Sequence, residues 1–311
     1  MSRSRLRRGP RSAGFTAAVC AALLTLAGCG GNEPVSVSEK AANLDTITPG
    51  VLKVAIQPYA PYTDLQGDTI VGLDGDILHA VAEKLDLKVE PEVADFAGML
   101  AGVQTRRVDI TIGGVAWTAE RQKQGLFTDP PYYSPPAMAV KAGKKFQTVE
   151  DLQGLDLGTV EGYVWVKSIQ AVPGAKLHAY PDGTGVFDDL GADRIAVGFL
   201  DPLLIIAGQK QRPDLGIETQ YLTPPTDEQV KERPDYQYFQ PYMTSFYLPK
   251  ESPKLEAAIS AEIRKMYESG EMTKLIEKYG GDPAEFLKPA PGLAESRQGV
   301  DRPADWAPPT I

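Results

Sequence analysis

The sequence of 311 residues has few cysteines and histidines and no long apolar run beyond its first 28 residues. Because His79 and His178 are the only histidines, a metal site built from several imidazoles is not expected. The two cysteines, Cys20 and Cys29, both lie near the N-terminus, so no disulfide framework is predicted for a folded body. No later segment approaches the roughly 18 uninterrupted apolar residues of a transmembrane helix, so none is predicted to cross a membrane.

The chain also lacks an excess of basic residues. It carries 32 Lys and Arg against 41 Asp and Glu, a net charge of −9. Five of the arginines lie in residues 1–28, which contain no acid, so the remainder has 27 basic and 41 acidic residues and a net charge of −14. A body this acidic is not expected to bind nucleic acid, whose phosphates require clustered Lys and Arg. The hydrophobic content of 42% supports sizeable cores, and the length favours two lobes over one domain.

The N-terminus has the features of a signal peptide. A basic stretch, Arg3–Arg11, precedes apolar and small residues at 13–28, too short for a membrane span and typical of a signal sequence. The stretch ends in Leu26-Ala27-Gly28-Cys29, which resembles the cleavage site of bacterial lipoproteins. This resemblance implies a signal peptide at 1–28 and a lipid on Cys29 that holds the protein in the cell envelope, at the outer face of the plasma membrane. An ordinary signal peptide with a chance cysteine is the alternative.

Processing before Cys29 would remove Cys20, so neither a catalytic thiol nor a structural zinc site is expected in the mature chain. Residues 29–48 are polar and small without hydrophobic periodicity, which predicts a flexible tether. Residues 289–311 are rich in proline and equally aperiodic, which predicts a loose tail.

Between these ends, strand and helix patterns alternate. The predicted strands are 51–56, 87–93, 108–113, 155–160 and 195–200, and the predicted helices are 75–85, 96–103, 163–169, 202–209, 255–267 and 273–279. Strands separated by helices indicate an α/β fold with mostly parallel sheets. Two such units, followed by a strand-like return of the chain at 236–248, indicate two lobes with a cleft. Ligands of such sheets bind at the carboxyl ends of the strands.

Residues 102–133 contain Thr118, Arg121 and the run Phe127-Thr128-Asp129-Pro130, and residues 71–77 read VGLDGDI. With these motifs the chain resembles bacterial solute-binding protein family 3, the polar amino-acid receptors of ABC importers. The resemblance covers about residues 49–288. The resemblance implies a two-lobed periplasmic-binding-protein type 2 fold with two hinge crossings that closes on one ligand. Lobe 1 would comprise 49–137 and 246–288, and lobe 2 would comprise 142–241. The crossings would lie near Met138–Lys141 and Tyr242–Ser245.

Two charged residues are the main candidates for ligand binding. Arg121 follows Thr118, a plausible helix cap, and an arginine there can grip a carboxylate with two parallel hydrogen bonds. Asp201 follows the apolar strand at 195–200, and a carboxylate at the end of a strand can face a cleft. The resemblance implies that Asp201 binds the ligand's ammonium group. A role as cap of the helix that begins at Pro202 is the alternative.

The resemblance implies further contacts. Backbone groups of Gly114 and Ala116 would hold the ligand's carboxylate and amine, although Ala116 lacks the hydroxyl that relatives often carry. Tyr59 and Phe96 would stack on the ligand side chain, with core packing as the alternative. Gln57, at the end of the first strand, could bind a polar side chain of the ligand.

The loop at 161–164 departs from the resemblance, since Tyr163 and Val164 stand where small hydroxyl residues are usual. Tyr163 could replace that ligand contact or fill space that a smaller ligand leaves. The predicted function is a monomeric, lipid-anchored substrate-binding protein that passes an amino acid or related zwitterion to ABC permease subunits. No catalytic residue, metal or cofactor is implied. The alternatives are an enzyme of the dehydratase type that uses Glu161 as acid or base, and a sensing receptor without transport.

Overall fold

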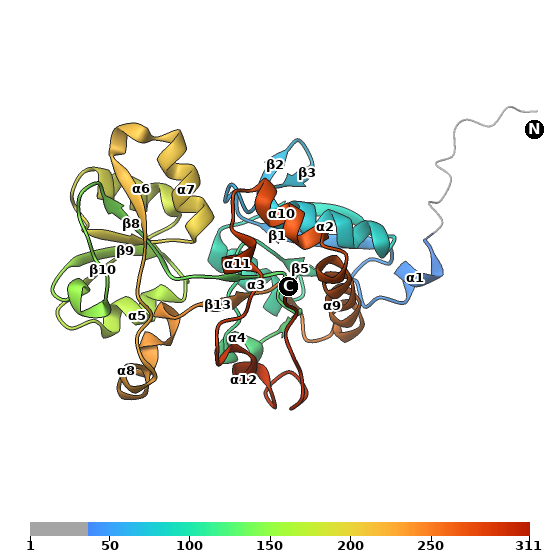
Figure 1. Ribbon diagram of the computed structural model, residues 1–311. Helices are drawn as coiled ribbons and strands as arrows, with labels where there is room; N and C mark the ends of the chain where they lie inside the picture. Colours follow the sequence, from blue (N-terminus) through green and yellow to red (C-terminus); the bar gives the residue numbers. More distant parts are fainter. Residues whose placement is uncertain (1–36) are drawn as a thin grey trace, which may run out of the picture. The chain divides into compact units, whose positions relative to one another are not determined.

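The computed structural model describes residues 37–311, and within this range the chain forms two five-stranded sheets with helices packed on both (Figure 1). The predicted signal peptide, Cys29 and most of the predicted tether lie outside the described residues. The prediction of a flexible tether is wrong for its C-terminal part, because residues 38–48 pack on the folded body. The backbone N–H of Ile47 donates to Asp109 at 2.6 Å, and the Asp45 carboxylate accepts from Lys254 N at 2.9 Å.

The first sheet and its helices form the first lobe. Its strands, in spatial order, are β4 (Lys88–Val93), β1 (Val51–Ile56), β5 (Ile110–Thr111), β14 (Tyr247–Leu248) and β6 (Leu126–Phe127). Its main helices are α2 (Leu73–Lys84), α3 (Phe96–Gln104), α9 (Pro253–Glu268) and α10 (Glu271–Lys278). β1 runs parallel to β4 and β5, as the alternating pattern predicts, whereas β14 is antiparallel to both of its neighbours. The Asp95 carboxylate caps α3 by accepting from Gly98 N at 2.6 Å.

The second sheet and its helices form the second lobe. Its strands, in spatial order, are β10 (Lys176–Tyr180), β9 (Asp156–Val160), β11 (Val197–Phe199), β8 (Ala137–Lys141) and β12 (Ile217–Tyr221). Its main helices are α5 (Trp165–Ala171), α6 (Gly183–Gly191) and α7 (Pro202–Gln211). Figure 1 shows these helices together with β8, β9 and β10, apart from β1, β5, α2 and α9. The prediction of an α/β fold is therefore confirmed.

The chain passes between the sheets through two paired strands. β7 (Tyr132–Ser134) and β13 (Tyr242–Thr244) run antiparallel, and each leads from one sheet to the other. The predicted crossing at Met138–Lys141 is wrong, because these residues form most of β8. That strand pairs with β11 on one side and β12 on the other, so it belongs to the interior of the second sheet. The second predicted crossing, Tyr242–Ser245, contains β13 and extends one residue beyond its end.

The C-terminal segment, residues 289–311, packs on the first lobe and includes α12 (Leu293–Arg297). The Arg297 side chain is fully buried, pairs with Asp301 and donates to the carbonyl oxygens of Thr128 at 2.8 Å and Phe127 at 3.1 Å. Trp306 packs with residues of both crossing strands. The prediction of a loose tail is wrong, because a buried ion pair and an aromatic anchor hold a segment that has no hydrophobic periodicity.

The smaller elements complete the described chain. They are α1 (Glu39–Ala42), β2 (Asp64–Gln66), β3 (Thr69–Val71), α4 (Ala119–Gln122), α8 (Asp227–Glu232), α11 (Pro283–Phe286) and three 3-10 turns at Val149–Leu152, Pro213–Leu215 and Pro234–Phe239. Among residues 37–311, no helix has both the length and the apolarity needed to span a bilayer.

Candidate functional site

A small cavity lies beside the carboxyl ends of β5, β9 and β11. It is lined by Phe96, Gly114, Ala116, Arg121, Tyr163, Val164, Trp165, Asp201 and Tyr242. Its volume is about 10 Å³, close to the smallest space that holds one water molecule. The lining includes all the predicted ligand-binding residues except Tyr59 and Gln57, so the structure brings together side chains from both lobes that the sequence treats as separate candidates.

Arg121 lies in α4, whose first turn is capped as predicted. The Thr118 hydroxyl accepts from Arg121 N at 3.0 Å. The guanidinium lies 5.3 Å from the centre of the Phe96 ring and donates to the carbonyl oxygens of Ala116 at 2.9 Å and Gly162 at 2.8 Å. Burial lowers the pKa of Arg121, but arginine remains charged at physiological pH. Since a guanidinium has five N–H groups, donors remain for a ligand carboxylate.

Asp201 follows β11 and occupies the cap position of α7, yet its side chain makes no capping hydrogen bond. Its buried carboxylate instead accepts hydrogen bonds from the hydroxyls of Tyr59 at 2.5 Å, of Tyr242, and of Ser134 at 3.4 Å. Burial raises the pKa of Asp201, and the three hydroxyls oppose this shift by stabilising the charged form. The carboxylate therefore faces the cavity rather than capping the helix. It has about four acceptor sites, which leaves one for a ligand cation.

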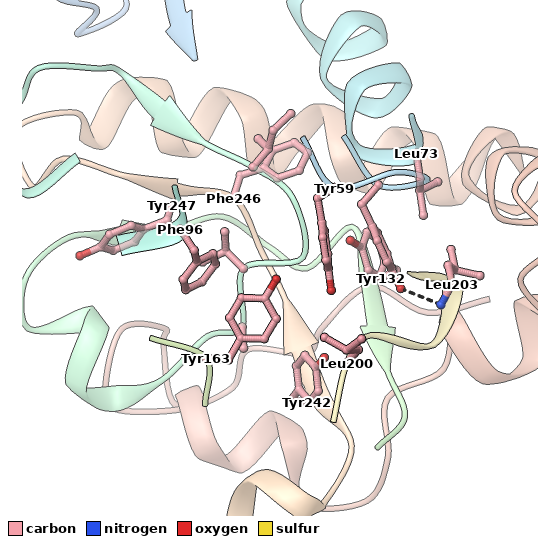
Figure 2. Packing of buried hydrophobic residues seen from close by; sticks show 14 of the residues in the cluster. Tyr59, Leu73, Phe96, Tyr132, Tyr163, Leu200, Leu203, Tyr242, Phe246 and Tyr247 are labelled. Atoms are coloured by element: carbon pink, nitrogen blue, oxygen red, sulfur yellow. Dashed lines mark hydrogen bonds between the residues drawn. The ribbon is translucent and has the colours of Figure 1, made fainter. Parts of the chain in front are cut away.

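The rings of Phe96, Tyr163, Trp165 and Tyr242 line the remaining space. The Tyr163 ring lies 4.8 Å from that of Phe96 at an interplanar angle of 66°, and 6.2 Å from that of Tyr59 at 88°. Trp165 lies 5.9 Å from Tyr163 on another side. Figure 2 shows the Tyr163 ring beside Phe96, with its hydroxyl toward Tyr59. Phe96 thus contacts the Arg121 guanidinium of its own lobe and the Tyr163 ring of the opposite lobe. Aromatic rings therefore form much of the wall of the site.

The backbone groups predicted to hold the ligand have protein partners. The N–H groups of Gly113 and Gly114 donate to one oxygen of Asp74, at 2.6 Å and 3.0 Å, and the Tyr132 hydroxyl donates to the other at 2.8 Å. Burial raises the pKa of Asp74 to about 6, against these hydrogen bonds. Asp74 therefore fixes the loop after β5. The Ala116 carbonyl is bonded to Arg121, as described above.

The structure separates two predicted residues, Gln57 and Tyr59, from the others. Gln57 lines a neighbouring groove of about 560 Å³, together with Tyr59 and the cap residues Asp95 and Asp182. Tyr59 does not line the cavity, but its hydroxyl donates a hydrogen bond to Asp201, which does. Gln57 therefore does not contact the same space as Arg121.

Sequence reasoning did not identify Tyr242, Ser134 or Asp74 as residues of the site. Tyr242 falls within a predicted crossing, but its hydroxyl reaches Asp201 because β13 pairs with β7 in a register that places Tyr242 opposite Ser134. Nothing local in the sequence signals this pairing. In the part of the chain that the structure describes, no three His, Cys, Asp or Glu side chains gather in a way that could hold a metal ion.

Comparison with known proteins places this geometry in a family. The chain matches bacterial extracellular solute-binding proteins, family 3, over residues 52–282. It is 30% identical over 169 residues to the ABC transporter arginine-binding protein 1 of Escherichia coli (strain K12), which covers 54% of this chain and 69% of that protein. It is 25% identical over 269 residues to the probable amino-acid-binding protein YxeM of Bacillus subtilis (strain 168), covering 85% and 94%.

The fold is shared as well. The solved structure of an ancestral arginine-binding protein bound to glutamine is similar, with a TM-score of 0.65, 26% identity, and coverage of 76% of this chain and 100% of that one. The prediction of a two-lobed periplasmic-binding-protein type 2 fold is confirmed. Because the family match extends over well more than half of the sequence, this chain belongs to family 3 of the bacterial extracellular solute-binding proteins.

Proposed function

We propose that the protein captures an amino acid or related zwitterion between its lobes and delivers it to ABC permease subunits. The observation that carries this proposal is the convergence of Arg121 and Asp201 on one cavity, the former from the first lobe and the latter from the second. Opposite charges at two sides of a small space match the carboxylate and ammonium of a zwitterion. The names of the relatives, an arginine-binding and a probable amino-acid-binding protein, support the same ligand class.

Capture would proceed by lobe closure about β7 and β13. The ligand carboxylate would bind the remaining N–H groups of Arg121, and its ammonium would bind the remaining acceptor site of Asp201. The bonds from Arg121 to Gly162 and from Tyr59 to Asp201 connect the lobes, so they would form as the lobes approach. Because closure excludes water, the two ion pairs would be stronger than in an open cleft.

The proposed function is binding without catalysis. Glu161, the carboxylate on which a dehydratase-type reaction would depend, is exposed and does not line the cavity. A lipid anchor at Cys29, proposed from Leu26–Cys29, would keep the protein at the outer face of the plasma membrane, within reach of the permease.

The proposal is tested by a thermal-shift screen of amino acids and related zwitterions on the purified protein, followed by calorimetry. A ligand at a hundredfold its Kd stabilises the folded state by about 2.7 kcal/mol. Arg121→Ala is expected to weaken binding at least a hundredfold, because removing one member of a buried ion pair costs about 3–5 kcal/mol.

The matched control is Arg107→Ala, which removes a surface ion pair with Glu92 outside the cavity and should leave affinity unchanged. Circular dichroism would show that both variants fold. Equal affinity of Arg121→Ala and the unmodified protein would contradict the proposed role of this site.

A further inference from the structure

The ring of Tyr163 occupies the space between Tyr59 and Phe96. It meets both rings edge-on, at centroid distances of 6.2 Å and 4.8 Å, and its side chain is 8% exposed. Edge-to-face contact at these distances is the favoured geometry of packed aromatic pairs. A ligand side chain lying between these two walls would therefore meet the Tyr163 ring.

The loop that carries Tyr163 is held in place from several sides. The Gly162 carbonyl accepts from the Arg121 guanidinium at 2.8 Å, and Tyr163 N donates to Val160 O at 3.2 Å. Gly162 has φ +78° and approaches Phe96 so closely that a Cβ there would lie 3.4 Å from the ring. Trp165 packs 5.9 Å from Tyr163 on another side. Rotation of Tyr163 out of this position would break ring contacts on three sides at once.

We propose that Tyr163 is a specificity-determining residue that restricts the site to compact zwitterions, with at most one or two non-hydrogen atoms in the side chain; this inference rests on the proposed function. The charged groups of Arg121 and Asp201 recognise the carboxylate and ammonium that all amino acids share. The cavity of about 10 Å³ that Arg121 and Asp201 share has no room for a long side chain while the ring stays in place, and the neighbouring pocket of about 320 Å³, which Arg121, Tyr163 and Val164 also line, does not include Asp201. Tyr163 belongs to the second lobe and Tyr59 and Phe96 belong to the first, so lobe separation withdraws the ring and lobe closure returns it to the space between them. Glycine or alanine would leave that space free for the ring on closure, whereas glutamine or arginine would keep the ring out and hold the lobes apart.

The test compares Tyr163→Thr with the unmodified full chain by calorimetry, with glycine, alanine, glutamine and arginine as probes. The unmodified protein is expected to bind glycine or alanine at least tenfold more tightly than arginine. Tyr163→Thr is expected to gain at least tenfold in affinity for glutamine or arginine and to change little for glycine. Tyr221→Thr, a tyrosine of the same lobe that is 53% exposed, is the matched control and should keep the original preference.

The outcomes separate this inference from the proposed function. If the unmodified protein binds arginine as tightly as Tyr163→Thr does, the ring does not select ligands and the inference fails while the proposed function stands. If neither protein binds any zwitterion, the proposed function fails and the inference fails with it. Tyr163→Phe keeps the ring and must keep the preference for compact ligands, and a shift toward arginine would overturn the inference. Should Tyr163→Thr not fold, the preference of the unmodified protein and of Tyr163→Phe still decides the question.

Discussion

Replacement of Arg297 by alanine is expected to destabilise the protein strongly, although this residue lies in a segment whose sequence looks unstructured. The guanidinium carbon lies 5.7 Å from the centre of the Trp117 ring and 5.2 Å from the centre of the Trp306 ring. It pairs with Asp301 and donates to two backbone carbonyl oxygens of the first lobe. No water can replace these contacts, because the side chain is fully buried.

The magnitude follows from what the substitution leaves behind. The Asp301 side chain is 3% exposed, so Arg297→Ala leaves a buried carboxylate without its partner, which costs about 3–5 kcal/mol. The Thr128 carbonyl oxygen also loses its donor, which costs about 1–3 kcal/mol if this oxygen stays dry, whereas the Phe127 carbonyl oxygen keeps the Arg302 guanidinium at 2.8 Å. Detachment of the segment at 289–311 would return all these groups to water. The loss in free energy of unfolding therefore cannot exceed the free energy with which residues 289–311 dock on the first lobe. We expect a loss of about 3–5 kcal/mol.

Urea unfolding of the unmodified protein, Arg297→Ala, Asp301→Ala and the double variant measures this loss and the coupling between the two residues. The double variant should lose less than the sum of the single variants, because neither charge is then left unpaired. Arg212→Ala is the control, since its ion pair with Asp188 is on the surface and is worth less than about 1 kcal/mol. A loss for Arg297→Ala as small as that of the control would refute the reasoning.

Two further variants test the site loop and the first sheet. Burial raises the pKa of Asp74 from about 3.8 to about 6, so the folded state binds this proton more tightly, and stability falls by up to about 3 kcal/mol as pH rises from 4 to 7. Asp74→Asn should remove this component, and equal pH slopes in urea unfolding would contradict it. Gly125→Ala would place a Cβ against the Tyr247 ring and 2.6 Å from Leu248 O, and should cost about 1–3 kcal/mol in the same assay. Gly102→Ala, with 3.4 Å to its nearest neighbour, should not destabilise.

The sequence predicts the elements whose signal is local. β1 has the predicted bounds, Val51–Ile56, because its apolar run is bounded by turn residues, and α3 begins after Asp95 because that residue supplies its cap. The antiparallel strands β8 and β12 were not predicted, since their pairing joins residues about 80 positions apart. β5 is shorter than predicted, at Ile110–Thr111, because strand length depends on the partners that a sheet provides.

The same difference between local and long-range signals explains which residues of the site could be predicted from the sequence. Arg121 and Asp201 could be proposed because each follows a recognisable local feature, a capped turn and the end of an apolar strand. Their hydrogen-bond partners could not be proposed, since Gly162 and Tyr59 lie 41 and 142 positions away. Gln57 has a suitable position at a strand end, yet it lines a different groove.

The partners of the two charged residues also determine where selectivity can arise. Arg121 and Asp201 gain binding free energy by pairing with the ligand's carboxylate and ammonium through the N–H groups and the acceptor site that the protein leaves unused. Every amino acid offers the same carboxylate and ammonium, so this gain cannot distinguish among them. Discrimination must come from the space beside these groups, because a side chain without room costs more than a hydrogen bond contributes. Tyr163 fills that space, and selectivity should therefore change with the size of residue 163 more than with any polar substitution in the cavity.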